Sequence, residues 1–176
     1  MRRNRAGFTL VELLITVAII GILAAIAIPN LLSAIQRSRQ KRTMVDMRTI
    51  GIALEARATD VNRYNAAGTI PSLAICTEPV THAQMRAALA PTYIKLIPSD
   101  DGWSNPYRFL VDQSWTGSVA AQHYVVWSAG RNGSATGTAG WDATSASPGG
   151  ATTNFNDDIL FSDGMFIQYP EGTQLP

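Results

Sequence analysis

The hydrophobic residues of this chain form one continuous block near its start. From Phe8 to Ile28 almost every residue is apolar, and Glu12 is the one carboxylate inside the block. A helix rises about 1.5 Å per residue, so a helix over this block would be about 30 Å long, the thickness of a bilayer's hydrocarbon core. The pattern therefore predicts a membrane-spanning helix over residues 8–28.

After this block the apolar residues become periodic. They return at steps of three and four, the spacing of one helix face, at Met44, Met47, Gly51, Leu54, Ala58 and Val61. Pro29 lies between the two patterns, and a proline inside a helix kinks it or opens it locally. We expect one long helix over residues 8–62, whose amphipathic second half carries a globular domain on its apolar stripe.

Short elements follow in the rest of the chain. Thr81-His-Ala-Gln84 matches a capping box and predicts a short helix that runs to about Leu89, ahead of Pro91. Alternation and turn residues predict strands over residues 107–112, 122–128, 159–161 and 165–169. Asp163-Gly164, between the last two strands, is a typical hairpin turn pair. The predicted fold class is α+β, with the long N-terminal helix packed on a small antiparallel β-sheet.

The region between the second and third predicted strands has a different composition. Residues 133–153 are rich in Gly, Ala, Ser and Thr, so they have little to bury and are expected to form a surface loop. Trp141 is the one large apolar side chain in the loop. It either anchors the loop on the globular domain, residues 63–176, or contacts another subunit or partner.

Charge and cysteine content narrow the choice of function. Beyond residue 62 there are five basic and nine acidic residues, so the domain is mildly acidic and we expect no nucleic-acid partner. Cys76 is the single cysteine, so an intrachain disulfide is impossible. We expect Cys76 to be a small apolar filler. No nucleophile, phosphate-binding or zinc-protease motif occurs, although an exported enzyme that pairs Cys76 with His82 or His123 is a remote alternative.

Glu12 leads to a family resemblance. The segment Gly7-Phe8-Thr9-Leu10-Val11-Glu12, after three arginines and before the apolar block, resembles the N-terminus of type IV pilin-like proteins. The resemblance implies that residues 1–7 are a leader, cut by a prepilin peptidase between Gly7 and Phe8, with N-methylation at Phe8. It also implies that Glu12 pairs with the N-terminal amine of a neighbouring subunit. The alternatives are a signal peptide cut near residues 25–27 and a Glu12 that merely reaches the lipid headgroups.

Two further segments resemble the major pseudopilin of type II secretion systems. Gly102-Trp-Ser-Asn-Pro-Tyr107 is similar to a W-G-N-P-Y segment, with Ser104 in place of the glycine. Residues 128–133 and 156–159 resemble two calcium-binding segments. This resemblance implies that Asn132, Asp157 and Asp158, with carbonyls near residues 128–130, bind Ca²⁺, an ion that takes 6–8 oxygen ligands. Alternatively, the two aspartates only form a turn before a strand.

Together these observations predict a structural subunit of a helical, pilus-like filament, the major pseudopilin of a type II secretion system. The alternative is a type IV pilin that forms a surface pilus. The expected partners are further copies of the chain, prepilin peptidase, other pseudopilins or minor pilins, and an inner-membrane assembly platform. Basic residues on both sides of the apolar block leave its orientation undecided. The resemblance implies a bacterial inner-membrane protein with a cytoplasmic N-terminus, whose domain lies in the periplasm or in an extracellular filament.

Overall fold

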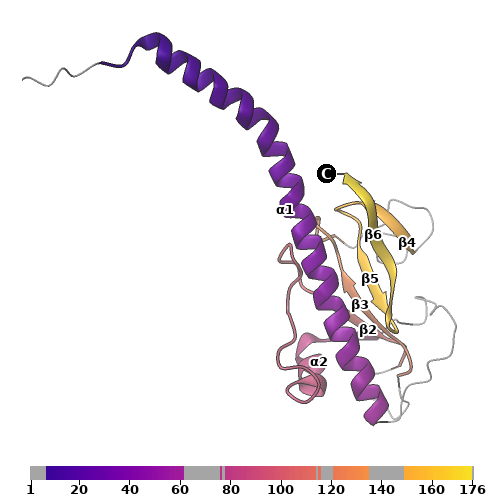
Figure 1. Cartoon of the computed structure of the whole chain (residues 1–176). Helices are drawn as coiled ribbons and strands as arrows, with labels where there is room; N and C mark the ends of the chain where they lie inside the picture. Colours follow the sequence, from indigo (N-terminus) through magenta and orange to yellow (C-terminus); the bar gives the residue numbers. More distant parts are fainter. Residues whose placement is uncertain are drawn as a thin grey trace, which may run out of the picture. The chain divides into compact units, whose positions relative to one another are not determined.

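The computed structural model describes residues 7–61, 76, 78–113, 115, 121–134 and 149–175 of this 176-residue chain. Most of the predicted leader and Trp141 lie outside the described residues. The elements in the described part are α1 (Leu10–Asp60), β1 (Glu78–Val80), α2 (His82–Leu89), β2 (Arg108–Val111), β3 (Tyr124–Ser128), β4 (Gly150–Asn154), β5 (Ile159–Ser162) and β6 (Met165–Leu175) (Figure 1). The arrangement is α+β, as predicted.

The long helix α1 confirms the prediction for residues 8–62 to within two residues at each end. Pro29 lies inside the helix, and the helix is continuous through it. The chain divides into two compact units, Met1–Gln36 and Arg37–Pro176, so the boundary between them falls within α1. The second part of α1 therefore belongs to the globular unit.

Four of the five strand pairs in the described sheet are antiparallel. The order is β1-β2-β3-β5-β6-β4, and only the β4–β6 pair is parallel. The four predicted strands correspond to β2, β3, β5 and the start of β6. The two edge strands were not predicted. Residues Gly150–Asn154, expected as the end of a surface loop, form β4 because their backbone pairs with β6.

The two faces of the sheet bury different sets of side chains. The face under the helices forms the main core, with Met47 and Ile50 from α1, Met85 from α2 and Phe161 from β5. The other face buries a smaller cluster around Cys76, Val125, Trp127 and Leu160. The strict alternation along β3 and β5 produces this division, since successive side chains of a strand point to opposite faces. Cys76 is the buried apolar filler that the sequence predicted.

The short helix α2 begins as the sequence predicts. The Thr81 hydroxyl accepts a hydrogen bond from the Gln84 backbone N–H, and the Gln84 side chain accepts one from the Thr81 N–H at 2.9 Å. This capping box satisfies backbone donors that the first helical turn leaves unpaired. Met85 and Leu89 on its inner face then pack into the main core.

Two buried amides hold the end of β6 in a domain that no internal disulfide can close. Gln40 Nε2, on α1, donates to Gln174 Oε1 at 3.2 Å. The Gln174 amide nitrogen donates to the carbonyls of Thr152, on β4, and Glu171, at 2.8 and 3.0 Å. Both glutamines are nearly inaccessible to solvent. The Gln40–Gln174 pair therefore ties the C-terminal strand to the helix and to its edge neighbour.

Candidate functional site

The start of α1 carries a second capping box, which the sequence analysis missed. The Glu12 carboxylate accepts hydrogen bonds from the Thr9 backbone N–H at 2.9 Å and from the Thr9 hydroxyl at 2.8 Å. In return, the Glu12 N–H donates to the Thr9 hydroxyl oxygen at 3.2 Å. The T-x-x-E spacing from Thr9 to Glu12 was the available signal, as the T-x-x-Q spacing was at Thr81. The carboxylate also lies at the helix end where partial positive charge accumulates.

The predicted processing residues precede this cap. Gly7 and Phe8 are exposed and lie outside the helix, which begins at Leu10. A Cβ atom added to Gly7 would have no described atom within 4 Å, so the surroundings of this residue are open. A peptidase needs an accessible, non-helical backbone at its cleavage site, and residues 7–9 provide one. Cleavage and methylation at this position remain predictions.

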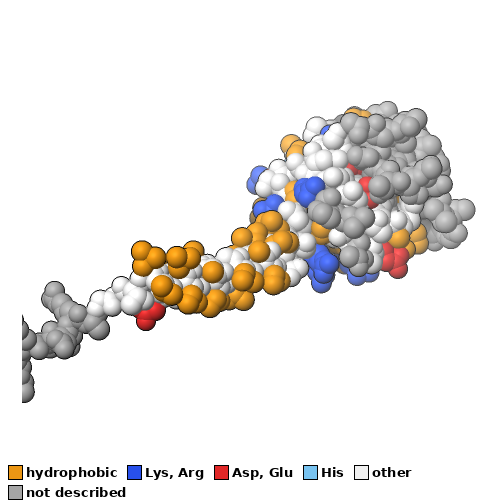
Figure 2. Space-filling model, turned by 90° about the horizontal axis from the view of Figure 1, so that it is seen from above, with side chains coloured by type: hydrophobic (Ala, Val, Ile, Leu, Met, Phe, Trp, Pro, Cys, Tyr) orange, Lys and Arg blue, Asp and Glu red, His pale blue; other side chains and the backbone are white. Residues whose placement is uncertain are grey.

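The apolar block of α1 has no partner within the described chain. Its large side chains are exposed, from 52% at Ile19 to 76% at Leu10. Figure 2 shows hydrophobic side chains covering the visible side of this part of the helix. By length and composition, α1 is the one described helix that could cross a membrane. A helix that is apolar on all sides requires lipid or other protein around it.

The turn formed by residues 99–107 is built on a buried carboxylate. Asp101 is 3% exposed. Its Oδ1 accepts from the Trp103 and Asn105 backbone N–H groups at 2.8 and 2.9 Å, and its Oδ2 accepts from the Ser128 hydroxyl at 2.7 Å. Ser104 has φ +70°, a left-handed conformation that favours glycine. The substitution of serine for the expected glycine therefore keeps the turn but strains its backbone.

The same turn is attached to α1. The Gly102 N–H donates to the Thr43 hydroxyl at 2.9 Å, and the Tyr107 hydroxyl lies 3.4 Å from the Thr43 carbonyl. A Cβ at Gly102 would overlap the Arg39 carbonyl, so only glycine permits this approach. The turn therefore connects the helix, through Asp101, to the loop that follows β3.

The predicted calcium ligands lie in that loop and in the segment before β5, and protein groups donate to several of them. Asn132 Oδ1 accepts from the Ser134 N–H at 2.9 Å. Asp158 Oδ2 accepts from the Trp127 indole N–H at 3.0 Å, and Asp158 is fully buried. Asp157 is 5% exposed.

Neighbouring groups complete the contacts between the two segments. Asn105 Nδ2 donates to the Gly130 carbonyl at 2.7 Å. Arg131 donates through its backbone N–H to the Phe155 carbonyl and through Nε to Asn156 Oδ1, both at 2.9 Å. In the described part of the chain, no group of three or more His, Cys, Asp or Glu side chains is placed to hold a metal ion. These contacts do not favour calcium, and its binding here remains a prediction.

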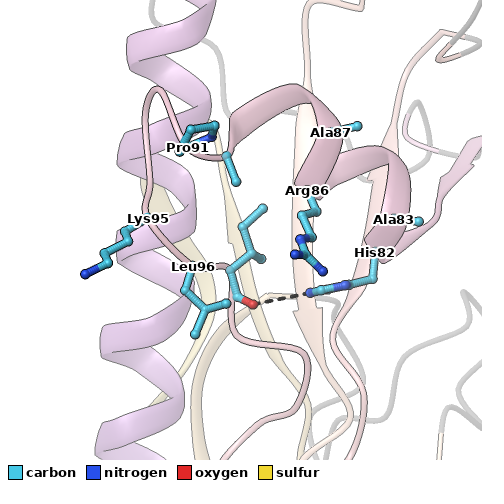
Figure 3. A pocket seen from close by; sticks show the side chains of 9 residues that line it. His82, Ala83, Arg86, Ala87, Pro91, Lys95 and Leu96 are labelled. Atoms are coloured by element: carbon cyan, nitrogen blue, oxygen red, sulfur yellow. Dashed lines mark hydrogen bonds between the residues drawn. The ribbon is translucent and has the colours of Figure 1, made fainter.

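A cavity of about 510 Å³ lies between α2 and the segment that follows it. Figure 3 shows His82 and Arg86 on one side and Lys95 on the other. The His82 Nε2 atom is 3.3 Å from the Ile97 carbonyl. The remaining lining is apolar or backbone, from Ala83, Ala87, Ala90, Pro91, Leu96 and Ile97. Among the described residues that line the cavity there is no cysteine, serine, threonine or carboxylate.

The remote enzyme alternative requires an activated thiol, and the surroundings of Cys76 have the opposite effect. Burial, with the Asp163 and Asp112 carboxylates nearby, raises the pKa of Cys76 from 9.0 to about 12. A nucleophilic cysteine needs a lowered pKa. His123 Nδ1 instead contacts Asp163 Oδ2 at 2.7 Å, beside the β5–β6 turn. This arrangement supports a structural role for all three residues.

Comparison with known proteins gives two family-model matches. Residues 2–28 match the prokaryotic N-terminal methylation motif, and residues 30–145 match type II secretion system protein G. The core protein G of the Aeromonas hydrophila type II secretion system is 34% identical over 110 residues, 62% of this chain and 75% of that protein. The Vibrio cholerae core protein G is 35% identical over 109 residues, 61% of this chain and 72% of that protein.

A second kind of relative matches over a shorter length. The type IV major pilin protein PilA of Myxococcus xanthus is 48% identical over 63 residues, 36% of this chain and 28% of that protein. No solved structure matches the chain. The similarity to core protein G thus extends over a much longer part of the chain than the similarity to the pilin.

Proposed function

Since this chain belongs to the type II secretion system protein G family, we propose that it is the major pseudopilin of such a system, a structural subunit of a helical, pilus-like filament. The protein G match over residues 30–145 carries the proposal, because it covers most of α1 and the part of the globular domain up to residue 145. The fold supports it, since α1 combines an exposed apolar half with a half packed into the domain. No feature of the described residues favours catalysis.

Assembly begins with processing. The methylation motif over residues 2–28 supports cleavage between Gly7 and Phe8 by a prepilin peptidase, followed by N-methylation at Phe8. Cleavage removes three arginines and changes the formal charge from +1 to −2. It also creates a terminal amine, a cation with a reference pKa near 8. In an apolar environment this amine and the Glu12 carboxylate of a neighbouring subunit attract strongly, and each is costly alone. Their pairing sets the register between subunits.

The filament grows from the inner membrane. The apolar half of α1 anchors each subunit there in a single pass, with its N-terminus in the cytoplasm. On assembly, the helices leave the bilayer and pack together, with the domains on the outside. Repetition of one heterologous contact produces an open helix. The other components are the peptidase, an inner-membrane assembly platform and further pseudopilins, and the domain faces the periplasm.

The runner-up is a type IV pilin in a surface pilus, and the Myxococcus xanthus match over 63 residues favours it. Deletion of the gene in the source bacterium separates the two functions. A secretion pseudopilin leaves its cargo proteins inside the cell when it is lost, whereas a pilin removes surface fibres seen by electron microscopy. Loss of fibres with normal secretion would reject the pseudopilin proposal.

The processing and assembly steps have their own test in the same cells. Mass spectrometry of the mature protein should find a methylated Phe8 as the N-terminal residue. Glu12→Val should be processed normally but should form no filaments, because the partner of the terminal amine is missing. Glu171→Gln, which removes an exposed carboxylate far from the N-terminus in sequence, is the control and should assemble. Filaments of normal length from Glu12→Val would contradict the role of Glu12.

A further inference from the structure

The loop over residues 128–134 and the segment over residues 154–158 are in direct contact. A Cβ at Gly130 would lie 2.6 Å from the Asp157 carbonyl oxygen and 2.9 Å from that of Asn156. These distances are shorter than van der Waals contact, and Gly130 has φ +61°. Glycine is therefore required, and it brings the two backbones together without a bridging group.

A calcium ion would join two such segments by collecting their oxygens. The structure assigns this task to the protein instead: we propose that the 128–134 loop is closed by Asp101, Asn105 and Arg131, and that the domain folds without a metal ion. The inference concerns the closure of the loop, so it does not depend on the filament function proposed above. Three sets of contacts support it.

Arg131 bridges the two segments with two donors. Its backbone N–H binds the Phe155 carbonyl and its Nε binds Asn156 Oδ1, both at 2.9 Å. A guanidinium is permanently charged and presents several N–H groups in a fixed plane. It therefore supplies positive charge and directional hydrogen bonds at the junction where a calcium ion would coordinate oxygens.

Protein donors also engage oxygens that calcium would need. Asn105 Nδ2 donates a hydrogen bond to the Gly130 carbonyl, and the Ser134 N–H donates one to Asn132 Oδ1. The Trp127 indole N–H donates one to Asp158 Oδ2. To bind calcium, these oxygens would have to share their lone pairs with donors that already lie at 2.7 to 3.0 Å, or lose those hydrogen bonds. This competition opposes metal binding.

Asp101 supplies the third set of contacts. This carboxylate is 3% exposed and receives three hydrogen bonds, two from the backbone of its own turn and one from Ser128 at the end of β3. Three hydrogen-bond donors thus satisfy a carboxylate that is almost fully removed from solvent. Asp101 thus holds the base of the loop, while Asn105 and Arg131 hold its middle.

Thermal melts of the full-length protein in detergent test the proposal, with tryptophan fluorescence as the readout. Melts are run in EDTA, in millimolar CaCl₂ and in millimolar MgCl₂. The midpoint should be the same in all three. A midpoint at least about 5 °C higher in CaCl₂ than in MgCl₂, a gain of more than 1 kcal/mol in a chain of this size, would overturn the proposal.

Variants test the named residues under the same conditions. Asp101→Asn should lower the midpoint by roughly 6–9 °C and Arg131→Gln by roughly 3 °C, equally with EDTA and with CaCl₂. Asn105→Ala is the milder replacement should Asp101→Asn fail to fold, and it should lower the midpoint by roughly 3–6 °C. Arg86→Gln, an exposed arginine on α2, is the matched control and should leave the midpoint unchanged. Wild-type midpoints for both Arg131→Gln and Asn105→Ala would also overturn the proposal.

Discussion

The two halves of α1 are one continuous helix, but they are stabilised in different ways. In the half before Arg37 the apolar side chains are exposed on all sides. In the half after it, one face is buried against the sheet and carries Met47, Ile50 and Leu54. The first half therefore depends on lipid or on other subunits, whereas the second depends on the chain's own core. Helicity alone does not show which surroundings a helix requires.

The same substitution at two glycines, one in each half of α1, tests this difference between the halves. We expect the largest loss of domain stability among our predictions from one of them. Gly51, in the second half, is covered by the Phe161 ring, which an added Cβ would overlap, whereas Gly21, in the first half, has nothing within 4 Å. Gly51→Val should destabilise the domain by about 3 kcal/mol or more, because overpacking forces the core apart. Gly21→Val should leave the melting midpoint of the domain unchanged. Equal midpoints for the two variants would remove the distinction between the halves.

The Gln40–Gln174 pair tests where along α1 the helix begins to contribute to the stability of the domain. Gln40 is the first buried residue along the described helix. Gln174→Ala removes three hydrogen bonds and leaves the buried Gln40 amide without this partner, so it should cost about 2 kcal/mol. Denaturant unfolding measures the loss. Gln122→Ala, at an exposed site, is the control. A double variant with Gln40→Ala should show less than additive loss; strict additivity would mean that the two amides act separately.

The two capping boxes give the smallest expected effect. Thr81→Ala should destabilise the domain by about 1 kcal/mol, since the cap of α2 lies within the folded unit. Thr9→Ala removes the same kind of cap from the start of α1 and should leave the unfolding of the domain unchanged. Both variants are compared by thermal melting in detergent. A shift of the domain midpoint by Thr9→Ala would show that the first half of α1 contributes to domain stability.

Sequence patterns predicted the elements whose signals are local. The block at residues 8–28, the stripe around Met47 and the Thr81 cap each depend on residues within a few turns of one another, and the helices form there. The edge strands β1 and β4 lack such a pattern. Glu78-Pro-Val and Gly150-Ala-Thr-Thr-Asn become strands because β2 and β6 offer free edges, and those neighbours are distant in the sequence.

The candidate sites show the same limit. The Gln40–Gln174 contact joins residues 134 positions apart, so no local signal announces it. The resemblance at residues 102–107 located the turn, but not the role of Asp101 as an acceptor for the Ser128 hydroxyl. At Thr9 and Glu12 the signal was present, since the T-x-x-E spacing is a capping box. Glu12 therefore caps its own helix, whatever its role between subunits.

The cap at Thr9 makes Glu12 an occupied acceptor before any neighbour arrives. Its carboxylate already receives two hydrogen bonds from Thr9, which fix the side chain at the helix end. Under the proposed assembly, the incoming amine must share or displace these donors, so docking is an exchange of partners rather than the capture of a free charge. The attraction between the amine and Glu12 is therefore offset in part by the loss or sharing of the Thr9 hydrogen bonds.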